Sequence, residues 1–233
     1  MKGHVFIAGA LGAIGRPLCR LLVADGWHVT GSTRSEQKAG ELEHLGVTPA
    51  VVDVFDPDIL ASVVAKAAPE IVIHQLTDLP DANDPALMAA ALERNTRIRI
   101  EGTRNLIAAA RAAGATRLIA QSIAFAYAPG PLPYSETSRL DPAASGVLSL
   151  ESQVLNNAAF AGIVLRYGRL FGPGTWAATP PKDGPLHIDE AADAARLAVT
   201  KGTAGIYNIA VEDGFVSAAK AHAQLGWKPG FRL

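Results

Sequence analysis

Short runs of aliphatic and β-branched residues alternate along the chain with segments whose apolar positions recur every three or four residues. The first pattern is typical of buried strands and the second of amphipathic helices. Strands and helices that alternate in this way form parallel βαβ units. We therefore expect an α/β fold with a Rossmann-like, doubly wound parallel sheet, in a single domain over 1–233. The predicted strands are 4–8, 28–32, 49–54, 71–76, 117–122, 163–167 and 206–209.

Several helices are predicted from the residues that open them. Asp56-Pro57 and Asp84-Pro85 each place a carboxylate acceptor before a proline, which is the usual start of a helix. The second of these is expected to open a long helix over 86–113. A further helix is expected to begin at Asp189.

Composition narrows the classes of partner. The chain has 233 residues, with 21 Lys and Arg against 22 Asp and Glu, so it offers no basic face for nucleic acid or anionic lipid. No apolar run reaches the roughly 20 residues of a membrane span. The apolar residues 5–8 do not read as a secretory signal peptide, because glycines interrupt the apolar stretch and no small-residue cleavage site follows it. The single Cys19 cannot form an internal disulfide, as is usual in a reducing compartment. We therefore predict a cytoplasmic protein with a small-molecule substrate and neither nucleic acid nor a membrane as partner.

The clearest chemical motif is the sequence GALGAIG at 9–15, which follows a predicted strand and opens a predicted helix. In a G-x-x-G-x-x-G turn, one glycine makes the tight turn, one lets the backbone approach a pyrophosphate and one lets helix and strand pack closely. The N–H groups and dipole of the helix then hold the phosphates. The predicted dinucleotide-binding residues here are Gly9, Leu11, Gly12, Ala13, Ile14 and Gly15.

The end of the second predicted strand bears on the choice of dinucleotide. An acidic residue at this point would bind the ribose 2′-hydroxyl of NAD and repel a 2′-phosphate. The chain instead reads Ser32-Thr33-Arg34-Ser35, with no acid before Glu36. Arg34 can pair with a 2′-phosphate, and Ser32 or Thr33 can hydrogen-bond to it. We therefore predict NADP(H) in preference to NAD(H); the alternative is that Arg34 is a solvated turn residue.

Motifs over nearly the whole chain, in order, resemble the extended branch of the short-chain dehydrogenase/reductase superfamily, the NAD(P)-dependent epimerases and dehydratases. The matching segments are Asp53-Val54, 71–76, Asn95 with 102–106, 165–174, 186–192 and Tyr207-Asn208. The resemblance implies that Asp53 and the adjoining Val54 contact the adenine ring. It also implies that Gln75 and Leu76 lie under the cofactor and that Asn95 belongs to the same site.

The family's catalytic pair is missing. Its Tyr-x-x-x-Lys motif provides a tyrosine that transfers a proton and a lysine that lowers the tyrosine pKa and binds the nicotinamide ribose. The resemblance implies that the helix corresponding to the one with this motif spans 144–160. Glu151 resembles the family's glutamate four residues beyond the lysine, which places Val147 and Ala143 where the lysine and tyrosine belong. Since losing a general acid costs roughly 10²–10⁴ in rate, the chain resembles an atypical member.

Three hydroxyls are candidates for the missing catalytic role. Ser122 ends the fifth predicted strand and could bond a substrate carbonyl, or serve structure alone. Tyr127 and Tyr134 flank a proline-rich stretch, and either could supply a proton, or simply pack. No spacing of His, Cys, Asp or Glu suggests a metal site.

Two loop-like regions, 129–142 and 172–185, follow predicted strands. Ligands of open α/β sheets bind beyond the carboxyl ends of the strands, so these loops are the expected walls of a substrate site, with plain solvent-exposed connections as the alternative. The chain is short for the family it resembles. That shortfall implies a small C-terminal substrate lobe built from parts of 172–187 and 210–233.

Three functions compete. The first is an NADP(H)-dependent oxidoreductase acting on a small carbonyl or alcohol through a non-standard proton donor. The second is a catalytically silent dinucleotide-binding sensor or interaction protein, and the third is a nucleotide-sugar epimerase or dehydratase. The long helix 86–113 resembles the family's dimer-forming helices, which suggests a homodimer, although a face buried within one chain would give the same pattern.

Overall fold

The computed structural model describes residues 2–80 and 84–233, and its centre is a seven-stranded sheet. The strand order is β3-β2-β1-β4-β5-β6-β9, and every pairing is parallel. The order reverses between β1 and β4, which makes the sheet doubly wound and confirms the predicted fold class. The strand bounds are β1 His4–Ala8, β2 His28–Thr33, β3 Thr48–Val51, β4 Ile71–His74, β5 Arg117–Ile123, β6 Ala161–Tyr167 and β9 Gly205–Ile209.

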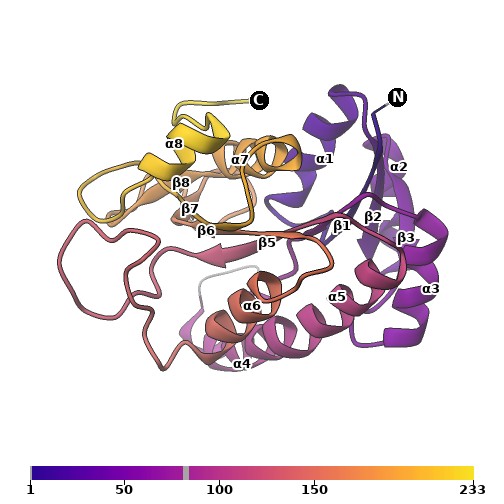
Figure 1. Cartoon of the computed structure of the whole chain (residues 1–233), viewed down its shortest axis with the longest axis horizontal. Coiled ribbons are helices and arrows are strands. Elements are labelled where there is room, and N and C mark those ends of the chain that lie inside the picture. The colour runs from indigo at the N-terminus through magenta and orange to yellow at the C-terminus, as the bar shows by residue number, and fades with distance from the viewer. Residues whose placement is uncertain (1, 81–83) are drawn as a thin grey trace.

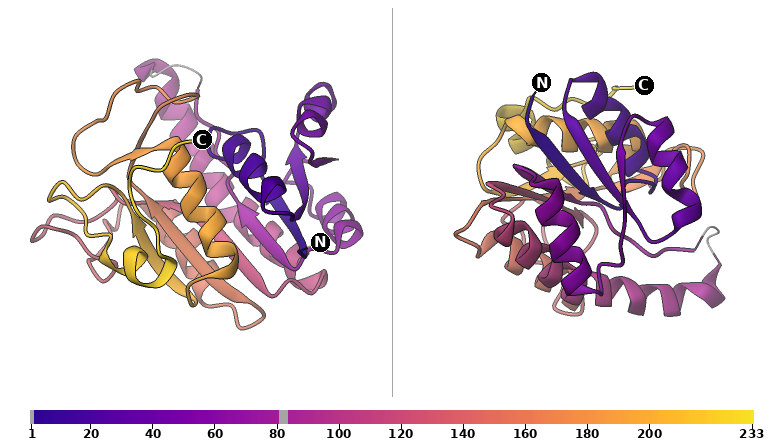
Figure 2. Two further views of the ribbon diagram at one scale, coloured as in Figure 1. Left: turned by 90° about the horizontal axis from the view of Figure 1, so that it is seen from above. Right: turned by 90° about the vertical axis from the view of Figure 1, so that its right-hand side faces the viewer.

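Helices cover both faces of the sheet (Figure 1). One face carries α1 and α7, with α8 at its margin, and the other carries α3, α4, α5 and α6. The left view of Figure 2 looks onto the face that α1 and α7 cover. The helix bounds are α1 Gly15–Ala24, α2 Ala39–His44, α3 Pro57–Ala67, α4 Pro85–Arg97, α5 Thr103–Ala112, α6 Ser145–Leu155, α7 Ile188–Thr200 and α8 Ala219–Leu225.

The sheet separates two apolar cores because its strands are buried on both faces. In β4, Ile71 and Ile73 pack with α1 and α7, whereas Val72 between them packs with α3 and α5. A near-continuous apolar run with alternating side chains is what a central parallel strand requires. This is why the sequence pattern located the strands well. Within residues 2–80 and 84–233, no helix has the length and apolar character needed to cross a membrane.

The two predicted Asp-Pro helix starts are confirmed. The Asp56 carboxylate accepts a hydrogen bond from the N–H of Ile59 at 3.0 Å, and α3 begins at the next residue. The Asp84 carboxylate accepts one from the N–H of Ala86 at 2.8 Å, and α4 begins in the same way. Each carboxylate satisfies a backbone donor that the first turn of a helix leaves free.

Three helix predictions need correction. The helix expected to begin at Asp189 begins at Ile188, because His187 is the cap: its ring nitrogen accepts the N–H of Asp189, while Glu190 accepts the N–H of His187. The helix expected over 144–160 is α6 and ends at Leu155. The long helix over 86–113 is present, but a π-helical turn, Ile98–Gly102, separates α4 from α5. Its use in a homodimer stays a prediction.

The segments expected to build a small substrate lobe contain elements that the pattern did not predict. The segment 172–187 contributes β8 (Pro185–His187), which pairs with β7 (Arg169–Phe171), just ahead of that segment, in a separate two-stranded parallel sheet. The C-terminal segment contributes α8, which packs on β9 and α7. These strands have three residues each, which is too short for an alternation to stand out in the sequence.

Candidate functional site

The glycine turn has the backbone geometry that its sequence predicts. Gly9 has φ +88°, and a Cβ there would lie 2.7 Å from the carbonyl oxygen of Gln75. A Cβ on Gly15 would overlap the carbonyl oxygen of Gly9, so helix and turn pack too closely for any side chain. Gly12 differs, because a Cβ there would meet only the Gly9 oxygen, at 3.3 Å. Glycine at 9 and 15 is needed by the protein itself, whereas glycine at 12 leaves open space beside the backbone.

The first turn of α1 is suited to an anion. Within the part of the chain that the structure describes, no side chain caps the start of α1, and the first turn contains no acidic residue. The N–H groups of Ala13, Ile14 and Gly15 have no acceptor among the described residues. The N–H of Arg16 donates to the carbonyl of Gly12, and Pro17 has no N–H. The helix dipole adds positive potential at the same place. Together with the space beside Gly12, this forms a cradle for a pyrophosphate.

The end of β2 supports the same turn. Ser32 is buried, and its hydroxyl accepts the N–H of Gly9 at 3.3 Å. Thr33 is half-buried, and its hydroxyl accepts the N–H of Ser35 at 3.2 Å. Arg34 is exposed at the tip of this turn. Ser32 and Thr33 end β2, the strand beside the glycine turn, and Arg34 follows it. The predicted adenosine ribose would lie here.

Gln75 lies next to the point where the strand order reverses. Its N–H donates to the carbonyl of Ala8, and its side-chain nitrogen makes a long hydrogen bond of 3.4 Å to the Tyr167 hydroxyl. Within the described part of the chain, its Oε1 is buried and accepts no hydrogen bond. A buried acceptor without a donor is uncommon in native structures and fits a ligand N–H at this position. The adjacent Leu76 is half-buried.

Three further predicted cofactor residues are Asp53 and Val54, in the loop after β3, and Asn95, in α4. Asp53 is exposed and accepts the N–H of Phe55, and Val54 is buried beside the π-helical turn. Asn95 is buried, and its amide bonds both the N–H and the carbonyl of Asp78. Asn95 therefore fixes the loop after β4, and any contact between it and a cofactor stays a prediction.

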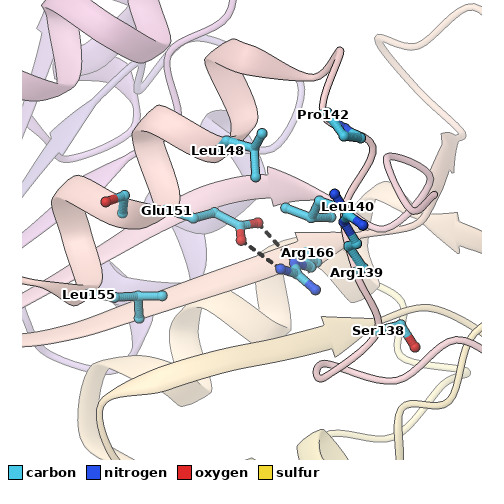
Figure 3. Close-up of a pocket in the computed structure, with 9 residues that line it drawn as sticks. Ser138, Arg139, Leu140, Pro142, Leu148, Glu151, Leu155 and Arg166 are labelled. Carbon is cyan, nitrogen blue, oxygen red and sulfur yellow. Dashed lines mark hydrogen bonds and ion pairs between the residues drawn. The ribbon is translucent and has the colours of Figure 1, made fainter.

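Two of the three candidate catalytic hydroxyls lie in one buried network. Ser122 donates to Glu151 at 2.7 Å, and Glu151 accepts two hydrogen bonds from Arg166, at 2.9 and 2.6 Å. Arg166 also donates to the Tyr127 hydroxyl at 3.1 Å, and Tyr127 donates to the side chain of Asn208. Figure 3 shows the paired Glu151 and Arg166 side chains at the centre of this network.

This network occupies the protons of both hydroxyls. Each donates to an acceptor inside the protein, and burial raises the pKa of Tyr127. Tyr134 stacks on Tyr127 with ring centroids 4.8 Å apart, and its hydroxyl accepts the N–H of Gly130. Of the three candidates, Tyr134 is thus the one whose own proton has no acceptor among the described residues. The catalytic roles of all three stay predictions.

The positions at which the resemblance places the family's catalytic pair are occupied by Val147 and Ala143. Val147 is buried in a small apolar cluster with Ala124, Ala126 and Tyr127. Ala143 precedes α6, and its N–H donates to the Asp141 carboxylate. Neither side chain can move a proton or carry a charge.

An open pocket of about 460 Å³ lies beside this network. Its walls are residues from 138–142, one face of α6, and the Glu151–Arg166 pair (Figure 3). The predicted loop 129–142 therefore does line a pocket. No residue of the glycine turn or of β1 to β4 is among its walls, so this pocket is separate from the cofactor cradle.

The second predicted loop, 172–185, reaches the cofactor cradle. A Cβ added to Gly174 would lie 3.6 Å from the Cβ of Ala13 in the glycine turn. Two residues later, the Trp176 indole donates to the carbonyl of Pro80 at 2.9 Å. The segment thus contacts the loops after β1 and β4, which flank the crevice where ligands of this kind of sheet bind. Sequence reasoning missed Trp176, since a single tryptophan in a Gly- and Pro-rich stretch carries no periodic signal.

Comparisons with known proteins agree with the cradle. The sequence model of a family described as NAD(P)H-binding matches residues 9–175. The chain is 40% identical over 228 residues to a 3-diazoavenalumate denitrifying reductase from a Streptomyces species, covering 94% of this chain and 71% of that protein.

Solved structures share the fold at low identity. The UDP-glucose 4-epimerase of Thermotoga maritima, with UDP-glucose, matches with a TM-score of 0.83 at 17% identity over 98% of this chain and 94% of that one. The UDP-glucose 4-epimerase of Thermus thermophilus, in complex with NAD, matches with a TM-score of 0.78 at 20% identity over 99% and 95%.

Proposed function

Because the chain belongs to the NAD(P)H-binding family, we propose that it is an NADP(H)-dependent reductase. The observation that carries the proposal is the cradle formed by the open space at Gly12 and the uncapped start of α1. Its similarity to a reductase over 94% of its length supports the same class of reaction. When bound, the cofactor supplies a hydride.

The residues that would hold the cofactor are the predicted ones. The glycine turn and the first turn of α1 would bind the pyrophosphate, with Thr33 and Arg34 at the 2′-phosphate. The unpartnered Oε1 of Gln75 would accept a hydrogen bond from an amide N–H of the ligand. A cytoplasmic location, where reduced dinucleotides are supplied, is part of the same proposal.

For the substrate, we propose a diazonium-type compound that bears a carboxylate, by analogy with the name of the reductase relative. In the reaction, a C–H bond forms with the hydride from NADPH while the C–N bond breaks. N₂ leaves with the electron pair of that bond. The products are the carboxylate compound with hydrogen in place of the diazonium group, N₂ and NADP⁺. The charges and electrons balance without any proton.

This reaction fits what the protein lacks. Reduction of a carbonyl requires a proton donor beside the substrate oxygen. Here Ser122 and Tyr127 donate their protons to Glu151 and Asn208, and α6 has valine where the family has its lysine. A substrate whose diazonium group leaves as N₂ requires the protein only to hold the substrate and to exclude water.

Carbonyl reduction is the second candidate, and Tyr134 is the observation that favours it. Its hydroxyl is half-buried and accepts a hydrogen bond from Gly130, so its proton stays available to a substrate oxygen. The two candidates therefore differ in whether Tyr134→Phe affects turnover. Carbonyl reduction predicts a large loss of rate, and diazonium reduction predicts almost none.

The test uses NADPH deuterated at the transferred position and meta-carboxybenzenediazonium as substrate. We expect deuterium in the benzoate product, N₂ by mass spectrometry, and loss of both in Gly12→Asp, whose carboxylate enters the cradle. Gly40→Asp is the matched control, because a Cβ at Gly40 meets nothing within 4 Å. Deuterium that appears only in the alcohols of a carbonyl panel would favour the second candidate. Cofactor binding without any turnover would instead identify a dinucleotide sensor.

A further inference from the structure

Arg99 lies in an irregular part of the long helix. It belongs to the π-helical turn Ile98–Gly102 that joins α4 to α5. Such turns are rare and are often found at functional sites, because the extra residue changes the direction of a side chain. The turn lies on the face of the sheet that α3 to α6 cover, opposite α1.

The Arg99 side chain passes beside the start of α6. A Cβ added to Gly146 in the first turn of α6 would lie 3.4 Å from Cδ of Arg99 and 3.1 Å from Cα of Thr96. The absence of a side chain at 146 thus leaves the path of the arginine open. The positive charge of Arg99 lowers the pKa of His74, the last residue of β4, and the negative charge of Glu151 raises the pKa of Arg99, so the three side chains lie near one another. Since Glu151 also bonds Ser122 near the end of β5, the guanidinium lies near the carboxyl edge of these two strands.

This guanidinium has no partner within residues 2–80 and 84–233, where it makes neither a hydrogen bond nor an ion pair, although the residue is half-buried. Glu151 makes no hydrogen bond to it and already accepts three, two from Arg166 and one from Ser122. His74 makes none to it either, and its ring nitrogens bond Thr103 and the N–H of Leu76. Burial lowers the pKa of Arg99, and the charge of Glu151 acts in the opposite direction.

We propose that Arg99 binds the carboxylate of the substrate through its planar fork of N–H donors. An arginine presents two parallel donors that match a carboxylate, and burial strengthens the pairing. The helix α6 contains no lysine or arginine of its own, so Arg99 brings positive charge to this side of the crevice from the neighbouring helix. The cofactor phosphates are assigned to the start of α1 on the opposite face, which leaves the substrate as the source of the anion. The inference rests on the proposed function for the location of the substrate.

The test measures binding and needs no turnover. Isothermal titration calorimetry gives the affinity of benzoate, and of its methyl ester, for the protein saturated with NADP⁺. The variants are Arg99→Gln and Arg99→Lys, with Arg104→Gln on the exposed side of α5 as matched control. We expect Arg99→Gln to weaken benzoate binding about tenfold to a hundredfold, the usual worth of a charge-assisted pair, and Arg99→Lys to weaken it less. Affinity for NADP⁺ and for the ester should stay within about twofold in every variant.

Two outcomes would overturn the proposal. If benzoate binds the folded Arg99→Gln variant with the same affinity as the wild type, Arg99 is not a carboxylate site. The same conclusion follows if benzoate binds neither protein. A loss confined to NADP⁺ affinity would identify a cofactor phosphate as the anion. Benzoate binding is measured without any reaction, so its result can be interpreted even if the diazonium assay fails. The deuterium assay can likewise succeed even if benzoate does not bind.

Discussion

The indole of Trp176 donates a hydrogen bond to the carbonyl oxygen of Pro80, 2.9 Å away, and so joins the loop after β7 to the loop after β4. Together with the contact between Gly174 and Ala13, it carries this segment across the proposed dinucleotide crevice. The segment would then cover a cofactor after it binds. Its hydrogen bond would contribute to retention of the cofactor rather than to folding of the sheet.

Trp176→Phe is therefore expected to weaken NADPH binding about twofold to tenfold, the range of one net hydrogen bond. Protein fluorescence during NADPH titration measures the change. Trp27→Phe, at a half-buried tryptophan between α1 and β2, is the matched control and should bind normally. Equal affinities in both variants and the wild type would show that the segment does not hold the cofactor.

Arg34 provides the test of dinucleotide selectivity. It is exposed at the end of β2, where a 2′-phosphate would lie and where no acid precedes Glu36. We expect Arg34→Ala to weaken NADPH binding about tenfold or more and to leave NADH binding within about twofold, because only NADPH has the additional charge. Arg20→Ala on the exposed side of α1 controls for net charge. If Arg34→Ala weakens both cofactors equally, the predicted preference for NADP(H) is wrong.

The Glu151–Arg166 pair is expected to be important for folding. Its side chains are only 6% and 4% exposed, and removing one partner would leave the other charge buried and unpaired. We expect Glu151→Gln and Arg166→Met each to lower the free energy of unfolding by about 3–5 kcal/mol in urea. The double variant Glu151→Leu with Arg166→Met should cost less than the sum of the single changes, since no charge remains unpaired.

A matched control comes from the exposed pair Arg97–Glu101, whose side chains are 58% and 31% accessible. Solvent screens such a pair, so Arg97→Met should leave the urea midpoint unchanged. If the buried and the exposed pair respond alike, the network around Glu151 is not what holds β5, β6 and α6 together.

Local signals explain which features could be predicted. The caps at Asp56 and Asp84 each depend on residues within one turn of one another, and the packing of Gly15 against Gly9 joins positions six residues apart, so their spacing in the sequence determines the structure. The strand order follows from the alternation of strands and helices. The Ser122–Glu151 contact joins positions 29 residues apart, and its geometry depends on how α6 lies on the sheet. The sequence therefore identified these candidates but not their shared network.

The misses have the same physical origin. The π-helical turn around Arg99 interrupts a segment whose apolar spacing is continuous, so the sequence predicted one unbroken helix there. The cap at His187 was missed because an imidazole acceptor is less common than the aspartate two residues later. In each case two local structures of similar propensity compete, and the sequence pattern alone does not decide between them.

The last prediction concerns the pH dependence of folding. His74 is buried, and burial, with the nearby charge of Arg99, lowers its pKa to about 4 from the ordinary value of 6.5. Its Nδ1 accepts the N–H of Leu76, so Nε2 carries the proton and donates to Thr103. Between pH 6.5 and pH 4, the unfolded chain binds a proton at this position and the folded chain does not. The free energy of unfolding therefore falls as the pH falls through this window, by about 3 kcal/mol in all.

His74→Gln removes this proton uptake. The difference in free energy of unfolding between wild type and His74→Gln should be constant above about pH 7 and should shift by about 3 kcal/mol against the wild type by pH 4, as measured by urea titration at each pH. Other groups whose pKa differs between the two states, such as His4, titrate in both proteins and cancel in this difference. Parallel curves for the wild type and His74→Gln would show that His74 takes up its proton in the folded protein as readily as in the unfolded chain.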